Sequence, residues 1–209
     1  IFEHDTDLGF VIDDISVEKY ADVPEGKTNL IKNGNMEQFW DGAAWQWNDE
    51  GVWDLSSGAG LNLGWDGNAE SQYSFKSASN LYLGTADGAP VWVKQNNIEL
   101  KPNTEYNFGM WVREHGAGFA ETDNLSFRLE SGSEATGDYY KSELVFSPSQ
   151  IDADARGVAV GQYTHIGGVL KTGSAANYSF VAEYVAGQPM TWRGYQIDEA
   201  TLYEADDYA

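Results

Sequence analysis

Apolar and polar residues alternate along much of this chain with the two-residue period of a half-buried β-strand. In residues 106–113 one face is apolar, and the opposite face carries Asn107, Trp111 and Arg113. Residues 124–130 repeat the pattern, with Arg128 and Glu130 opposite an apolar face. Further strands are expected at 72–83, 91–98, 142–146, 163–170, 178–185 and 196–203. Many short strands separated by polar turns predict an all-β fold, an antiparallel two-sheet β-sandwich of the jelly-roll kind.

The two ends of the chain carry similar strand-like sequences, GFVIDDISVE at 9–18 and GYQIDEATLY at 194–203. Asp13 and Asp198 are 198 − 13 = 185 positions apart, about the size of one all-β domain. We therefore expect residues 1–20 to be the terminal strand of a preceding repeat or an N-terminal extension, 21–27 to be a linker, and 28–209 to be one module. A chance similarity between two strand sequences is the alternative.

Composition narrows the class of protein. The 209 residues can bury one sizeable core, and the absence of cysteine excludes disulfides. The 33 acidic and 12 basic residues give a net charge of −21, which repels phosphate and argues against nucleic acid and strongly anionic glycans as partners. No apolar run has the length of a membrane-spanning helix, so we expect no membrane insertion. We take the module to be a monomer.

Three sequence motifs, in this order along the chain, resemble the motifs of one protein family. They are NLIKNGNME at 29–37, QNNIELKPNTEYNFGMWVR at 95–113 and YQIDEATL at 195–202. Together they are similar to bacterial carbohydrate-binding modules of the galactose-binding-like β-sandwich type, families 4, 9, 16 and 22. The resemblance implies polysaccharide binding by a bacterial secreted or cell-surface protein, in which neighbouring domains of the same polypeptide accompany the module. It also implies a structural calcium ion.

In that family the Glu of the opening motif and the Asp of the closing motif contribute to the calcium site. Here the resemblance implicates Glu37 and Asp198, with Asn33 or the carbonyls of its turn as further ligands. Strand alternation places Asp198 with Ala200 and Leu202 on the core side, where a carboxylate is costly unless it is paired or metal-bound. The alternative is that Asp198 bonds to backbone amides and Glu37 is exposed.

Tryptophans on polar strand faces are candidate sugar-binding residues, because the C–H faces of pyranose rings stack on indoles. Trp111 faces away from the expected core, so we predict a bare indole; a loop lying over it is the alternative. Arg113, Asn107, Arg128 and Glu130 would hydrogen bond the sugar hydroxyls on one sheet face, provided that the two strands are neighbours.

Three further tryptophans are candidates for the same site. Trp92 alternates with Val91 and Val93 and so faces away from them. In some related modules a Trp soon after the opening motif is part of the ligand site, and Trp45 or Trp47 is nearest to that position.

Two other classes of function are alternatives to binding. A β-jelly-roll polysaccharide hydrolase would carry a Glu-x-Asp-x-x-Glu run and an alginate-type lyase an Arg-x-Glu-hydrophobic-Arg strand, and neither run occurs. A structural or adhesion repeat fits the acidity but has no reason to carry an outward aromatic face. We therefore predict a non-enzymatic module that binds a neutral plant or algal glycan such as β-glucan, xylan or mannan.

Overall fold

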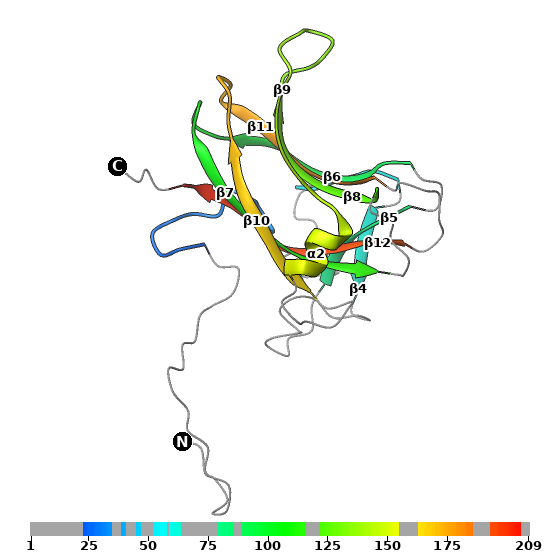
Figure 1. Ribbon diagram of the computed structural model, residues 1–209. Helices are drawn as coiled ribbons and strands as arrows, with labels where there is room; N and C mark the ends of the chain where they lie inside the picture. The colour runs from blue at the N-terminus through cyan, green and yellow to red at the C-terminus, as the bar shows by residue number, and fades with distance from the viewer. Residues whose placement is uncertain are drawn as a thin grey trace, which may run out of the picture.

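The computed structural model describes residues 23–34, 39–40, 45–46, 52–57, 59–63, 79–85, 89–115, 122–154, 163–185 and 193–205. No helix in these ranges is long and apolar enough to cross a membrane. The elements, in chain order, are β1 (Phe39–Trp40), β2 (Trp45–Gln46), β3 (Asp54–Leu55), β4 (Ala59–Leu63), β5 (Ser79–Thr85), β6 (Val91–Glu99), β7 (Glu105–His115), β8 (Asn124–Ser131), β9 (Tyr140–Phe146), α2 (Pro148–Asp154), β10 (Thr164–Lys171), β11 (Asn177–Val185) and β12 (Arg193–Glu204) (Figure 1).

The strands β3 to β12 form two five-stranded antiparallel sheets that make the two layers of a sandwich (Figure 1). Sheet 1 has the order β10-β7-β12-β5-β4, and sheet 2 has the order β3-β6-β11-β8-β9. The strands β1 and β2 pair with each other. The predicted antiparallel β-sandwich is confirmed, and β6 to β12 lie where the alternating pattern placed strands.

Apolar residues from both sheets fill the space between the layers. Phe108 of β7 in sheet 1 packs against Phe127 of β8 and Phe180 of β11 in sheet 2, with ring centroids 4.7 and 5.4 Å apart. All three side chains are buried. Burial of each such ring stabilises the fold by about 1.5–3 kcal/mol. The contact also places β7 and β8 in opposite layers.

The opening segment, residues 29–34, runs beside β12 where the pairing of β12 with β5 has ended. The side chain of Asn29 donates to the carbonyl of Ala200 at 2.9 Å and accepts from the amide of Leu202 at 3.0 Å. The carbonyl of Gly34 accepts from the amide of Ala200 at 2.7 Å. A Cβ at Gly34 would lie 2.2 Å from the Ala200 carbonyl oxygen, so this approach requires glycine.

Candidate functional site

Trp111 lies on the outer face of sheet 1, as predicted, but its indole is covered. Only 3% of the residue is exposed, and it packs with Tyr163 and edge-on against His165, whose ring centroid is 5.4 Å away. His165 lies on the neighbouring strand β10, where it pairs with Trp111 of β7. Its side chain fills the space above Gly109, where a Cβ would lie 2.8 Å from the Nε2 of His165. The expectation of a bare indole is therefore wrong, because side chains of β10 and the residue before it lie over it.

Arg113 and Asn107 share this outer face with Trp111. The Nε of Arg113 donates to the Oε1 of Gln196 at 2.5 Å, and the guanidinium lies 5.0 Å from the centre of the Tyr163 ring. Asn107, which is half-buried, lies further along the strand, where it pairs with Val169 and Tyr203. The side chains of Trp111 and Arg113 are thus occupied by contacts within the protein.

Asp198 also lies on the outer face of sheet 1, directly opposite Trp111 in the β12–β7 pairing. The register shifts between Asp198 and Thr201, and Glu199 has a φ of 50° in the left-handed region. This bulge breaks the alternation, so Asp198 faces away from the core that contains Ala200. Its predicted core-facing orientation was wrong. The residue is nonetheless fully buried, and its Oδ1 accepts from the Glu199 amide at 2.8 Å.

The opening turn lies beside this bulge. Asn33 has a φ of 46°, and its carbonyl accepts from Nε1 of Trp53 at 3.3 Å. The bond between Gly34 and Ala200 then holds the turn next to the residues that follow Asp198. Within the described ranges, no group of three or more acidic or histidine side chains is arranged to hold a metal.

Three predicted site residues fall where the structure gives no side chain. Glu37 and Trp47 lie outside the described residues, and only the backbone of Trp45 is described, as part of β2.

Arg128 and Glu130 lie on the opposite side of the sandwich from Trp111 and Arg113. The prediction that they share one sheet face required β7 and β8 to be neighbours, but these strands belong to different sheets. The outer face of sheet 2 instead brings Arg128 and Glu130 together with Trp92. As predicted, Trp92 faces away from the core, being half-buried between two fully buried valines.

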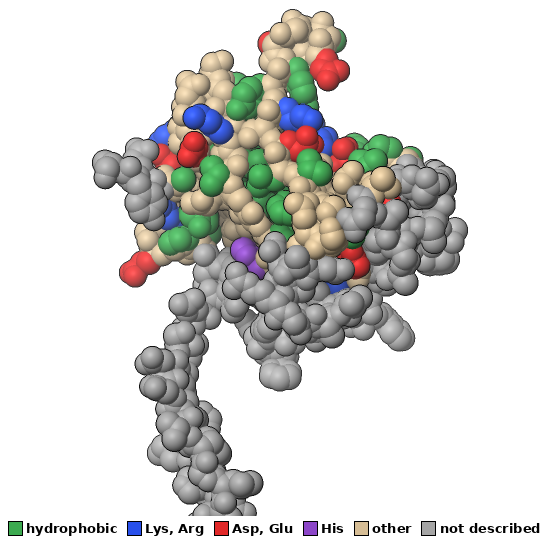
Figure 2. Space-filling view, in the orientation of Figure 1, with side chains coloured by type: hydrophobic (Ala, Val, Ile, Leu, Met, Phe, Trp, Pro, Cys, Tyr) green, Lys and Arg blue, Asp and Glu red, His purple; other side chains and the backbone are tan. Residues whose placement is uncertain are grey.

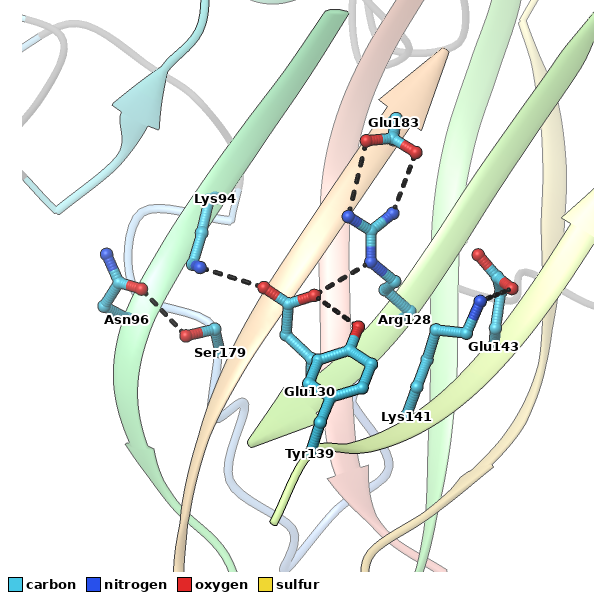
Figure 3. Close-up of polar contacts among 9 residues, drawn as sticks. All are labelled: Lys94, Asn96, Arg128, Glu130, Tyr139, Lys141, Glu143, Ser179 and Glu183. Carbon is cyan, nitrogen blue, oxygen red and sulfur yellow. Dashed lines mark hydrogen bonds and ion pairs between the residues drawn. The ribbon is translucent and has the colours of Figure 1, made fainter. Parts of the chain in front are cut away.

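Charged side chains on this face form one connected network (Figure 3). The Nζ of Lys94 lies 2.9 Å from Oε1 of Glu130, and the Nε of Arg128 lies 3.0 Å from the other oxygen of that carboxylate. The guanidinium of Arg128 also contacts the carboxylate of Glu183 at 3.1 and 3.4 Å. The hydroxyl of Tyr139 donates to Glu130 at 3.2 Å. We call Trp92, Lys94, Arg128, Glu130, Tyr139 and Glu183 the platform.

The network favours the charged forms of Arg128 and Glu130. Burial of Arg128 opposes its charge, but hydrogen bonds to Glu130 and Glu183 outweigh this and raise the pKa of the guanidinium above its ordinary value. Burial would likewise raise the pKa of Glu130, but hydrogen bonds from Lys94 and Arg128 outweigh it and lower that pKa. The four linked side chains are between 14% and 28% exposed, so they are shielded and still reachable by solvent.

The platform is balanced in charge, although the chain is strongly acidic. Lys94 and Arg128 match Glu130 and Glu183, and the adjoining pair Lys141 and Glu143 is joined at 2.7 Å. Figure 2 shows basic and acidic side chains next to one another on the described surface. By comparison, the whole chain has 33 acidic and 12 basic residues.

Lys94, Glu183 and Tyr139 were not among the predicted site residues. A usable signal existed for two of them. Alternation in 91–99 places Lys94 on the face of Trp92, and alternation in 177–185 places Glu183 opposite the apolar residues of β11. The contribution of Tyr139, just before β9, depends on how the β8–β9 hairpin returns over the sheet, which no local pattern indicates.

No protein-family model and no curated protein matches the chain. Its fold is similar to the enzymatically active domain of bacteriophage CBA120 tailspike protein 4, with a TM-score of 0.53 over 85% of this chain and 21% of that chain, at 14% identity. It is also similar to arabinose-bound MgGH51 α-L-arabinofuranosidase, with a TM-score of 0.51 over 84% of this chain and 26% of that chain, at 15% identity.

A family 16 carbohydrate-binding module aligns over 83% of this chain and 99% of that chain, at 19% identity and a TM-score of 0.49. The chain thus spans about a quarter or less of the tailspike and arabinofuranosidase chains. The likenesses to the tailspike and arabinofuranosidase chains concern the fold alone.

Proposed function

We propose that this protein binds a neutral polysaccharide, without catalysis, on the platform of sheet 2. The observation that carries the proposal is the network of Lys94, Glu130, Arg128 and Glu183, joined by ion pairs on a sheet face that also bears Trp92. Sugar hydroxyls both donate and accept hydrogen bonds, and paired carboxylates and cations offer both kinds of partner in fixed positions. Trp92 and Tyr139 supply aromatic surface for the C–H faces of the rings.

Charge supports a neutral ligand. The platform pairs its charges internally, so an anionic glycan would gain little there and would meet the repulsion of a chain with net charge −21. β-Glucan, xylan and mannan are the neutral candidates. Affinity electrophoresis in gels containing each of them tests the proposal: retention is expected in at least one gel and in none that contains alginate or pectate.

A matched pair of variants locates the site in the same gels. Trp92→Ala removes an aromatic ring from the platform, and Tyr203→Ala removes one from the outer face of sheet 1. We expect the first to reduce retention and the second to leave it unchanged. Equal retention of both variants and the wild type would place the site elsewhere.

A second candidate surface lies on the outer face of sheet 1 and consists of Trp111, Arg113 and Asn107. Asn107 is within reach of solvent, whereas Trp111 and Arg113 are engaged with His165, Tyr163 and Gln196. Sugar stacking on Trp111 would require this cover to move. We therefore favour the platform.

A polysaccharide hydrolase or lyase is the runner-up. The acid of a glycosidase needs a raised pKa so that it holds a proton at neutral pH. The pKa of Glu130 is lowered by its cationic partners, which suits a permanently charged hydrogen-bond acceptor. This difference argues against Glu130 as the acid of a glycosidase. A structural or adhesion repeat would show no retention in any glycan gel.

We also propose a structural calcium ion at the bulge of β12. Asp198 supplies a fully buried carboxylate, and the Asn33–Gly34 turn lies beside it through the bond between Gly34 and Ala200. Carboxylate and carbonyl oxygens are the ligands that calcium prefers. Glu37, the second carboxylate implied by the family resemblance, follows this turn by three residues in the sequence.

We infer that the module belongs to a secreted or cell-surface bacterial protein and accompanies neighbouring domains. Its alignment with parts of two much larger chains supports this arrangement. A weak binding site is then useful because several modules on one polypeptide raise the effective affinity.

A further inference from the structure

A groove opens at the edge of sheet 2, beside the platform. Its volume is about 750 Å³, within the range of small-molecule sites. The walls come from the opening segment, from residues at β3 and from the second half of β6. Leu30 and Val52 give it an apolar side, while Lys32, Asp54 and Asn97 line it with polar groups.

A bulge in β6 turns two consecutive side-chain amides, those of Asn96 and Asn97, toward this groove. The register between β6 and β11 shifts between Tyr178 and Phe180, and Asn97 has a φ of 58°. As a result Asn96 and Asn97 are both exposed, although strand alternation would bury one of them. Bulges that re-aim side chains occur frequently at binding sites.

The groove is held in shape by hydrogen bonds. The buried amide of Gln95 accepts from the Lys32 backbone amide at 2.9 Å and donates to the Lys32 carbonyl at 3.0 Å. Asn96 donates to the carboxylate of Asp54. It accepts from the hydroxyl of Ser179 at 2.8 Å (Figure 3). Among the residues that the structure describes, none bonds to the side chain of Asn97. Its amide is thus presented by a fixed wall and available to a ligand.

The lining groups indicate the ligand class. Lys32 would repel a cation, and Asp54 and Glu99 would repel an anion. A neutral group with vicinal hydroxyls can satisfy all of them together with the amides, while Leu30 and Val52 contact its C–H surface.

The groove and the platform are continuous. Ser179 of β11 lies between Asn96 of β6 and Glu130 of β8. Its hydroxyl donates a hydrogen bond to Asn96, and it is the register partner of Glu130. A glycan lying across the strands along this row reaches the groove at the Asn96 end. We propose that the groove is a subsite for a terminal or branching sugar of the neutral glycan held on the platform, an inference that rests on the proposed function.

Calorimetric titration with a length series, from the disaccharide to the hexasaccharide of the retained glycan, tests this subsite. Asn97→Gly removes the amide and keeps a residue that accepts positive φ. Asp54→Asn changes the opposite wall without loss of bulk. Glu134→Gln, at the exposed tip of the β8–β9 hairpin, is the control. Loss of one hydrogen-bonding group predicts a roughly 2- to 10-fold weaker affinity for the hexasaccharide in both groove variants.

The outcomes separate the two proposals. Weaker hexasaccharide binding by the groove variants, with disaccharide binding unchanged, supports the subsite. If the groove variants bind every oligosaccharide with wild-type affinity, while the Trp92→Ala protein binds each of them more weakly, the groove proposal is wrong and the platform proposal stands. If the wild type binds no member of the series and no neutral polysaccharide, both proposals fall. Thermal unfolding at wild-type temperatures confirms that the variants are folded.

Discussion

The guanidinium of Arg128 meets the carboxylate of Glu183 through two contacts, at 3.1 and 3.4 Å, between the neighbouring strands β8 and β11. Val181, which pairs with Arg128, is 1% exposed on this outer face. The pair therefore lies over apolar surface and is partly withdrawn from water, unlike an ordinary surface ion pair.

Glu183→Gln should lower the free energy of unfolding by roughly 1–2 kcal/mol, because Arg128 loses a charged partner in a shielded position. The control Glu143→Gln breaks the more exposed pair with Lys141 and should cost at most about 0.5 kcal/mol. Chemical denaturation of both variants measures the difference. Equal losses of unfolding free energy in the two variants would mean that solvent screens the Arg128–Glu183 pair as fully as the Lys141–Glu143 pair.

The network should lose stability in acid. The pKa of Glu130 is lowered in the folded protein, so the unfolded chain takes up a proton first as the pH falls. The stabilisation is complete above the ordinary Glu pKa of 4.5 and is lost as the pH drops through the lower folded value. Comparing the wild type with Glu130→Gln isolates this residue from other acids and from His165. Parallel stability curves for the two proteins between pH 3 and pH 7 would contradict the assignment.

Removal of calcium should destabilise the sandwich. A ligand bound only by the folded state stabilises it by roughly 2.7 kcal/mol when its free concentration is about 100 times the dissociation constant. We expect a chelator to lower the melting temperature of the wild type and added calcium to restore it. Asp198→Asn should unfold at the same temperature with and without the chelator. An unchanged wild-type melting temperature would exclude the ion.

Trp111 should matter for stability and not for platform binding. Because its indole is buried, Trp111→Ala should cost roughly 3–5 kcal/mol of unfolding free energy. Trp111→Phe, which retains a ring, should stay folded and bind glycan like the wild type. Loss of binding by a folded Trp111→Phe protein would return the site to sheet 1.

The alternation of residues predicted which face of each strand is apolar. Phe108, Met110 and Val112 face the core as expected, and Trp92 and Trp111 face outward. Alternation is a property of one strand and its own side chains, so it can be read locally.

Three features of the site could not be predicted in this way. The partition of β7 and β8 between different sheets depends on long-range pairing, and consecutive strands give no local sign of it. The bulge after Asp198 depends on the left-handed conformation of Glu199, which is a glutamate and carries no glycine-like signal. The cover over Trp111 likewise comes from His165 and Tyr163, far along the chain.

The most direct test of the account is an NMR titration of the labelled protein with the hexasaccharide of the glycan that affinity gels identify. Binding on the platform predicts that backbone amide shifts gather on β6, β8 and β11, with the guanidinium resonance of Arg128 among them. Shifts confined to the outer residues of β7, β10 and β12, or none at saturating sugar, would contradict it.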